Sequence, residues 1–292
     1  MLGLRLLAAV LLGGLAGSAS AHGAHEHALG WRLDPVLLVP LLLALLIYAV
    51  GWSRLAQRAS SAPRGAGLFV SGWAVLTFSL VSPLHAAGER SFTMHMMEHE
   101  LIMLVATLLL AMSSSGGVMA WGLPRPLRQA LGGSWKAPLQ SLWRRLTEPV
   151  TATAIQAVVM WGWHAPPLFD RALEHSGWHI AQHACFFVSS LLFWWAMLNP
   201  RRGGYGVSAA CLFVTSLIGG ALGALMSFSS SPWYADYAAM GMTGIGLDPT
   251  DDQRLAGLIM WIPGGLVHGA AAIAMFYKWL KASEGTHALS VH

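Results

Sequence analysis

The chain has 292 residues, of which 55% are hydrophobic and only 10% charged, and its mean hydropathy is +0.55. A soluble core could not bury this much apolar surface, so the composition excludes a soluble enzyme or binding module and indicates an integral membrane protein. The net charge of +4 and the pI near 9.4 follow from the membrane topology argued below, so they do not predict nucleic-acid binding.

The N-terminal segment, residues 1–21, has one arginine and a short apolar run rich in Leu and Ala, and it ends in "ASA". These features predict a cleaved secretory signal peptide; an uncleaved anchor is the alternative. Cleavage would leave a histidine-rich, outward-facing segment at residues 22–34. His22, His25 and His27 form a short tract of the kind that binds metals, and the free amino group of His22 could help to chelate copper.

Seven further apolar stretches follow, each near the roughly 20 residues that cross a bilayer as a helix. They lie near residues 35–52, 66–84, 95–113, 149–166, 178–198, 206–229 and 253–279. The sequence therefore predicts an all-α fold, a bundle of seven transmembrane helices. The membrane domain spans residues 35–281, and a cytoplasmic tail follows at residues 282–292.

Basic residues give the orientation of this bundle. Twelve lie on one side of the predicted topology: Arg54, Arg58, Arg64, Arg125, Arg128, Lys136, Arg144, Arg145, Arg201, Arg202, Lys278 and Lys281. The opposite side has four: Arg32, Arg90, Arg171 and Arg254. By the positive-inside rule the first side is cytoplasmic, which places the N-terminus outside and the C-terminus in the cytoplasm.

Histidines concentrate on the predicted outer side, which holds ten of the thirteen. His95 and His99 are four residues apart on the third span, so they project from one helix face. His179 and His183 repeat this spacing on the fifth span, and His164 closes the fourth span at the same depth. The spacing predicts that these five side chains converge near the outer surface.

The ligand types favour copper. Imidazole nitrogens and thioether sulfurs suit this metal, and thioethers suit Cu(I) in particular. Methionines surround the first histidine pair: Met94, Met96, Met97 and Met103. Met103 continues the stripe of His95 and His99, so it is predicted to be a further ligand. Glu98 and Glu100 could be partners that support the metal ligands or solvated acids at the membrane interface, and the second interpretation is favoured.

Other interpretations of the same residues remain open. Histidines and methionines in spans can simply pack and form hydrogen bonds, which is the favoured interpretation for His268 alone. A haem-binding electron-transfer protein would take one axial histidine from each pair. A copper permease could use His268 as a deeper step. An enzyme is not expected, because the sequence has no phosphate-binding loop, nucleophile elbow or soluble catalytic domain.

Two glycine and proline motifs predict features of helix packing. Gly219 and Gly223, four residues apart, predict a close approach between two helices. The sequence "WIPGG", with Pro263, predicts a kink in the last span that could open room for His268.

Three blocks of the sequence resemble a known family. They are "MHMMEHELIMLVATLLLAM", "WGWHAPPLFDRALEHSGWHIAQHACFFVSSLLFWWAML" and "DQRLAGLIMWIPGG". In this order and spacing they are similar to the CtaG-type multispan cytochrome c oxidase assembly factors, over roughly residues 31–281. The third span departs from the family pattern, because it reads "VATLLLAM" where the family often has a Pro-Pro pair.

The resemblance implies a seven-helix protein of the bacterial plasma membrane that serves the maturation of a haem-copper oxidase, with a role in its copper supply. It also implies that the outer histidines of the family correspond to His95, His99, His164, His179 and His183, and that Asp252 and Gln253 form an acidic-amide pair. The expected partners are oxidase subunits, periplasmic copper chaperones and the lipid bilayer. We expect copper to pass from the N-terminal histidines to the paired histidines and then to the oxidase.

Overall fold

The computed structural model describes residues 30–57, 65–133, 136–201 and 204–290. Within these ranges all regular secondary structure is helical, which confirms the all-α prediction. The predicted signal peptide and the tract of His22, His25 and His27 lie outside the described residues, so both stay predictions.

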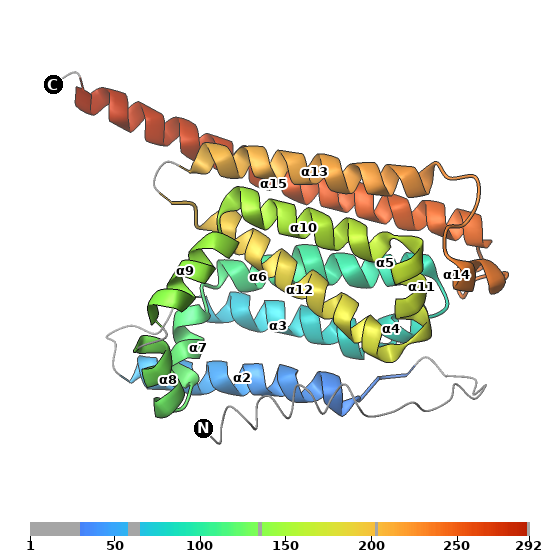
Figure 1. Ribbon diagram of the computed structural model, residues 1–292, viewed down its shortest axis with the longest axis horizontal. Helices are drawn as coiled ribbons and strands as arrows, with labels where there is room; N and C mark the ends of the chain where they lie inside the picture. The colour runs from blue at the N-terminus through green and yellow to red at the C-terminus, as the bar shows by residue number, and fades with distance from the viewer. Residues whose placement is uncertain (1–29, 58–64, 134–135, 202–203, 291–292) are drawn as a thin grey trace.

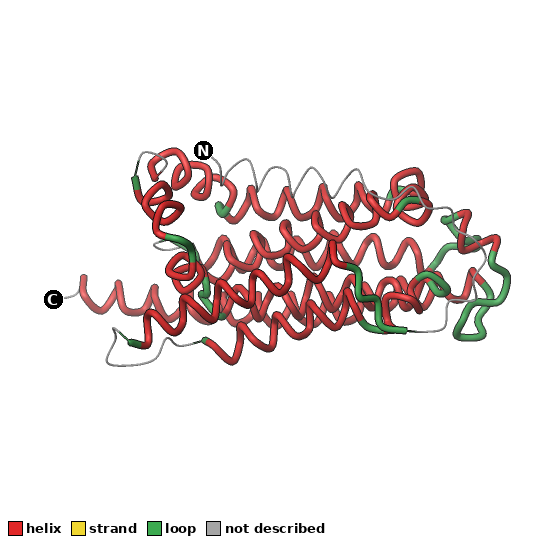
Figure 2. The backbone as a smooth tube through the Cα atoms, turned by 90° about the horizontal axis from the view of Figure 1, so that it is seen from below, coloured by secondary structure: helices red, strands yellow, loops and turns green. Residues whose placement is uncertain are grey.

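Seven helical segments run side by side along the long axis of the described part of the molecule (Figures 1 and 2). They are α2 (Pro35–Ala56), α3 (Ala66–Val81), the continuous run of α5 (Phe92–Glu100), η1 (Leu101–Ala106) and α6 (Thr107–Met112), α10 (Pro149–His164), α12 (Ser176–Leu198), α13 (Tyr205–Ser227) and α15 (Pro249–Ser290). Each coincides with one predicted apolar stretch, and α15 continues through most of the predicted tail.

Five of these segments in the described ranges are long and apolar enough to cross a membrane: α2, Phe92–Met112, α12, α13 and Pro249–Glu284 of α15. The structure is therefore that of a helical membrane protein. Helices α3 and α10 have only 16 residues each, which is short for a bilayer core about 30 Å thick. Seven spans thus stay a prediction.

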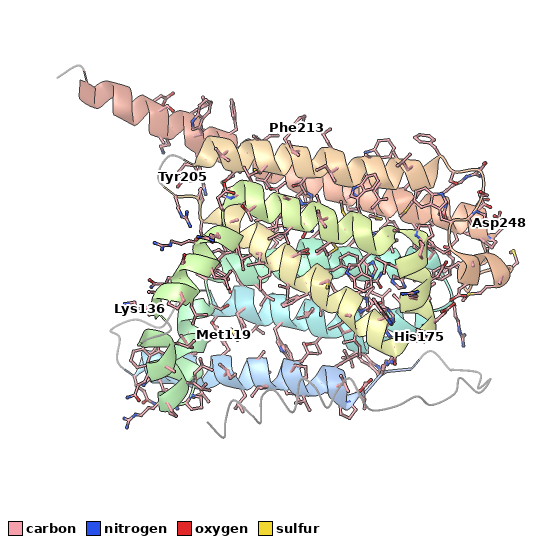
Figure 3. All side chains as sticks on the ribbon, viewed as in Figure 1. Met119, Lys136, His175, Tyr205, Phe213 and Asp248 are labelled. Atoms are coloured by element: carbon pink, nitrogen blue, oxygen red, sulfur yellow. The ribbon has the colours of Figure 1, made fainter. Side chains whose placement is uncertain are left out.

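Short helices close both ends of the bundle. At one end, here called the histidine end, lie α4 (Pro83–Gly88), α11 (Pro166–Glu174) and α14 (Ala235–Ala239); at the other, the basic end, lie α7 (Gly116–Gly122), α8 (Arg125–Gly132) and α9 (Lys136–Leu146) (Figure 1). Figure 3 shows His175 and Asp248 at the former and Lys136 at the latter. The connections rich in basic residues and those beside the histidines thus lie at opposite ends of the bundle. Which end faces the cytoplasm stays a prediction.

Glycines bring α13 and α15 into backbone contact. A Cβ on Gly257 would lie 2.5 Å from the carbonyl oxygen of Gly223 and 2.5 Å from Ser227 Oγ, so only glycine fits there. The predicted close approach therefore occurs at Gly223. At Gly219 a Cβ would meet only the end of Met160, at 3.9 Å.

Replacing Gly257 with alanine is expected to lower the apparent melting temperature of the protein in detergent. The added methyl group must push two backbones apart, which costs about 1–3 kcal/mol. Gly269→Ala on the same helix is the control, because a Cβ there meets nothing within 4 Å and alanine favours helix by up to about 1 kcal/mol. Equal melting of the two variants would contradict the close approach.

Candidate metal centre

The position of α5 is set by Asp252, near the start of α15. This carboxylate is 1% exposed and accepts hydrogen bonds from Phe92 N (2.6 Å), Ser91 Oγ (2.9 Å) and Thr93 N (3.3 Å). The first N–H groups of a helix have no partner within it, and the helix dipole favours an anion at that end. Asp252 thus holds the helix that carries His95.

The neighbouring amide, Gln253, holds the connection between α13 and α15. Its Oε1 accepts a hydrogen bond from Trp233 N (2.6 Å), and its Nε2 donates to the carbonyl oxygen of Ser231 (3.3 Å). This connection contains α14 and therefore Tyr237. The acidic-amide pair implied by the family resemblance supports the candidate centre from outside it.

Six histidine side chains gather at the histidine end of the bundle, from four helices. They are His85 of α4, His95 and His99 of α5, His164 of α10, and His179 and His183 of α12. Ring centroids lie 4.4 Å apart for His95 and His99, 5.1 Å for His99 and His183, and 5.3 Å for His95 and His179. The structure thus brings together the five histidines that the spacing predicts to converge, and adds His85.

Two sets of three histidines could each hold one metal ion. In the first set, His95, His99 and His183, one nitrogen from each ring lies within 4.8 Å of the others, and the same holds for His85, His179 and His183. Nitrogen ligands about 2.0–2.1 Å from a tetrahedral ion lie roughly 3.4 Å from one another. Small side-chain rotations would close the first set. The second would also require His85 Nε2 to give up its hydrogen bond from Arg32 (2.7 Å). His183 belongs to both sets.

Buried ring nitrogens in this cluster have no hydrogen-bond partner. They are His95 Nε2, His99 Nδ1 and Nε2, His164 Nε2, His179 Nε2 and His183 Nε2. A buried polar atom without a partner costs about 1–3 kcal/mol, and native structures contain few of them. A cation bound among these nitrogens would satisfy several at once, so the residues fit a metal ion.

Hydrogen bonds on the far side of two rings set their tautomers. The Nδ1 atom of His164 lies 2.6 Å from the carbonyl oxygen of Met160 and must donate to it. The hydroxyl of Tyr237 lies 2.6 Å from the carbonyl oxygen of Gly88 and 3.1 Å from His95 Nδ1. The phenol gives its one proton to the carbonyl, so His95 Nδ1 donates to the phenol oxygen. Both rings therefore present an unprotonated Nε2, the form that binds metals.

Burial raises the pKa of Tyr237 well above its ordinary value, so the phenol stays protonated. Tyr237→Phe is expected to lower metal affinity about 10–100-fold, because the partner that orients a metal-binding histidine is lost. Metal titration of the purified variant measures this. Tyr234→Phe is the control, because its hydroxyl donates to the carbonyl oxygen of His164 (3.0 Å) and touches no ring nitrogen. Equal affinity in both variants would contradict the assignment.

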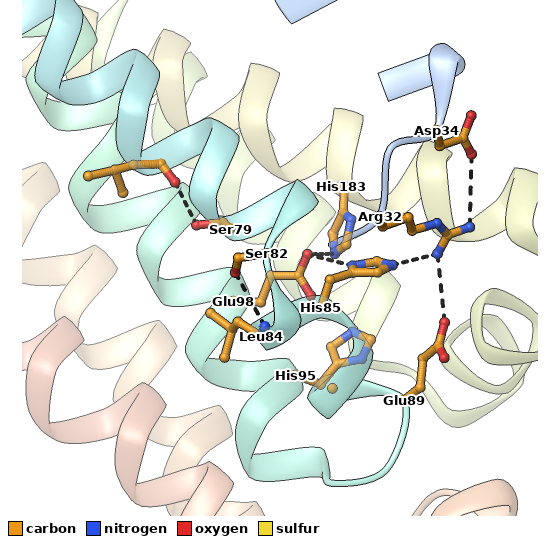
Figure 4. Close-up of polar contacts among 12 residues, drawn as sticks. Arg32, Asp34, Ser79, Ser82, Leu84, His85, Glu89, His95, Glu98 and His183 are labelled. Carbon is orange, nitrogen blue, oxygen red and sulfur yellow. Dashed lines mark hydrogen bonds and ion pairs between the residues drawn. The ribbon is translucent and has the colours of Figure 1, made fainter. Parts of the chain in front are cut away.

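The interpretation of Glu98 as a solvated acid is wrong. The side chain is fully buried, with Oε1 2.9 Å from His85 Nδ1 and 3.7 Å from His183 Nε2 (Figure 4). Arg32 donates to His85 Nε2 (2.7 Å), so His85 Nδ1 carries the proton donated to Glu98. Helix α4 folds back over α5 and removes this face from solvent. The Oε2 atom of Glu100 is buried as well.

His85 was not predicted as a site residue because it lies on α4, beyond the end of the second apolar stretch. A local signal was present: Ser82 followed by Pro83 marks a helix start, and Ser82 Oγ does accept a hydrogen bond from Leu84 N (3.2 Å). This signal predicts a short helix, but it does not predict that the helix turns its histidine towards α12.

Two further residues lie outside the cluster: the predicted ligand Met103, and His175. Met103 lies in the π-helix η1, where it lines a separate cavity together with Glu100 and His268. His175 is exposed at the start of α12. Beside the cluster, Arg32, His85, His179 and His183 line a small cavity of ≈ 60 Å³, and His179 is the least buried of the six histidines.

Apolar helices that enclose a buried histidine cluster at one end define a helical membrane protein with a candidate metal centre. Residues 46–282 match the model of the cytochrome c oxidase caa3 assembly factor family. The chain therefore belongs to this family, which confirms the resemblance noted in the sequence.

The chain is also similar to uncharacterized proteins of three mycobacteria. Those of Mycobacterium bovis and Mycobacterium tuberculosis are 25% identical to it over 86% of this chain, and that of Mycobacterium leprae is 24% identical over 86%. The chain spans only 39–40% of the length of these relatives. No solved structure matches it.

Proposed function

We propose that this protein serves cytochrome c oxidase assembly by binding copper at the histidine cluster and handing it to an oxidase subunit. Family membership supports the assembly role. The observation that carries the copper assignment is the set of buried ring nitrogens without partners, on five histidines that face one another. The role is transfer by ligand exchange, with no catalysed reaction.

The donor set supports copper over other ions. Neutral imidazoles suit copper, zinc and iron, and among the first-row divalent ions Cu(II) binds most tightly to nitrogen ligands. The two free cysteines contribute no thiolate to the sets of histidines, so a thiolate-rich zinc site is not formed within the described residues. Glu98 Oε1 lies 3.7 Å from His183 Nε2, so a cation bound at the histidines would stabilise the ionised form of this carboxylate.

Copper has an exit at the side of the cluster. His179 is partly exposed and lines the cavity beside Arg32 and His85, so a ligand from an oxidase subunit can replace it first. Exchange then proceeds one ligand at a time, and copper chaperones outside the membrane would load the cluster by the same route. In this proposal the tract of His22, His25 and His27 is the first receiver.

The geometry favours a metal ion over haem. A bis-histidine haem inserts its macrocycle between two ligands, but the rings of His85 and His179 are stacked 5.1 Å apart and those of His95 and His179 5.3 Å apart. The cavity beside them, of ≈ 60 Å³, would not hold a porphyrin. Copper permeation stays the other alternative that the sequence leaves open.

The experiment is complementation of a deletion strain, with copper and haem measured in the purified oxidase. His95→Ala/His179→Ala is expected to give oxidase that has its haem but lacks most of its copper, and His175→Ala is expected to restore both. His175 is the matched control because it is exposed at the start of the same helix as His179. Oxidase with a full copper content in the deletion strain would overturn the proposal.

A further inference from the structure

We propose that the protein has a second copper site, selective for Cu(I), in the cavity lined by Met103, Met160, Met260 and His268. This inference rests on the proposed function for the identity of the metal. The site is separate from the histidine cluster, because none of its four ligands belongs to the two sets of histidines that could hold an ion there.

The cavity lies where η1, α10, α13 and α15 meet. Its volume of ≈ 30 Å³ has room for an ion or about two waters. Polar groups line it as well as thioethers: Glu100, Gln156, Thr215, Ser216 and His268. Polar side chains inside a membrane bundle are costly to bury and mark functional sites, so this cavity is not a simple packing defect.

The ligand types select Cu(I). Three thioether sulfurs and one imidazole form a soft, neutral donor set, which hard ions and most divalent ions bind poorly. The Nδ1 atom of His268 donates to the carbonyl oxygen of Gly264 (2.7 Å), so its Nε2 carries a free lone pair. Methionine side chains have three rotatable bonds, so their sulfurs can close on an ion of this size.

Trp194 preorganises two of these ligands. Its ring stacks on that of His268, with centroids 5.1 Å apart and planes 9° apart, and its Nε1 donates to the carbonyl oxygen of Met103 (3.0 Å). The same carbonyl accepts from Thr107 Oγ1 (2.6 Å) within the π-helical region. Such π-helical turns are frequent at functional sites, and here one places Met103 at the cavity.

An unpartnered oxygen and open space also fit a cation. The Oε2 atom of Glu100 is buried and has no hydrogen-bond partner, and an ion in the cavity would be its partner. Gly264 faces this oxygen, since a Cβ there would lie 3.9 Å from it, and a Cβ on Gly219 would lie 3.9 Å from Met160 Sδ. The glycines therefore leave the cavity open between these two groups.

The cavity lies one helical turn from the histidine cluster, towards the basic end. Met103 follows His99 by four residues and Met160 precedes His164 by four, which is about 6 Å along each helix axis. The two sites are therefore neighbours along both helices.

The test is Cu(I) titration of the full-length protein with X-ray absorption at the copper edge. Wild type is expected to bind more Cu(I) than Met103→Leu/Met260→Leu and to show copper–sulfur scattering that this variant lacks. Leucine conserves the volume of methionine, so folding should be retained, and the melting temperature checks this. Met226→Leu is the matched control, because Met226 is buried in the same apolar cluster as Met260 but does not line the cavity.

Absence of copper–sulfur scattering in wild type, or its persistence in the double variant, would overturn the inference. His183→Ala separates this outcome from failure of the proposed function. If only the histidine cluster has been wrongly assigned, wild type and His183→Ala both show copper–sulfur scattering. Their copper–nitrogen scattering is then the same, because His183 binds no copper. If only the second site is wrong, wild type shows nitrogen scattering alone.

Discussion

His183→Ala is expected to lower the affinity of the histidine cluster for Cu(I) by more than about 100-fold. His183 belongs to both sets of three histidines that could hold an ion, so its loss leaves two ligands in each. Loss of a supporting partner alone typically costs 10–100-fold, and loss of a ligand should cost more. Competition with a chromogenic Cu(I) chelator measures this affinity.

The same variant gives a second readout without metal. Because His183 Nε2 has no hydrogen-bond partner, its removal should cost the metal-free protein less than an ordinary buried side chain would. Copper that fills the histidine cluster at 100 times its Kd should stabilise wild type by about 2.7 kcal/mol. The variant should gain less stability from copper, because only the second site remains to bind it. His175→Ala should behave as wild type. Unchanged copper affinity in His183→Ala would contradict the assignment.

Asp252→Ala is expected to destabilise the protein by about 3 kcal/mol and to weaken metal binding with it. The carboxylate accepts three hydrogen bonds at the buried start of α5, and each donor left without a partner costs about 1–3 kcal/mol. Melting in detergent and copper titration of the same sample measure both effects. The two should fall together, because α5 carries two of the six histidines.

Asp251→Ala is the matched control for this prediction. Asp251 is the neighbouring residue, but it is exposed and pairs only with Arg254, three residues on (2.9 Å). Such surface pairs contribute about 0–1 kcal/mol. Equal melting temperatures of Asp252→Ala and Asp251→Ala would show that the Asp252 carboxylate does not hold α5 in place.

Much of the bundle could be predicted from apolar stretches near 20 residues long. The depth of the histidines along each stretch and the spacing of four residues also predicted which of them meet. That prediction succeeded for His95, His99, His179 and His183 because helix periodicity is local and survives packing.

What the sequence could not show depends on how separate segments fold onto one another. Glu98 lies near a helix start, where acids are usually solvated, and only the return of α4 buries it. Met103 follows His99 by four residues and so lies on the same helix face, but it lines a different cavity beside α15. Tyr237 orients His95 from a residue 142 positions away, and no local pattern predicts such a contact.

The roles of Asp252 and Gln253 show the same limit. The family resemblance pointed to both residues, but it did not say what they contact. Only the contacts to Phe92 and Trp233 show that the pair positions α5 and α14 around the cluster.

The most direct test of the copper assignment is the metal content of the protein as isolated in mild detergent, recorded together with its visible absorption spectrum. We expect near-stoichiometric copper at the histidine cluster in wild type, no Soret band, and loss of that copper in His95→Ala/His179→Ala. A Soret band that disappears in the double variant would show instead that the six histidines hold haem, and the account of copper transfer would be wrong.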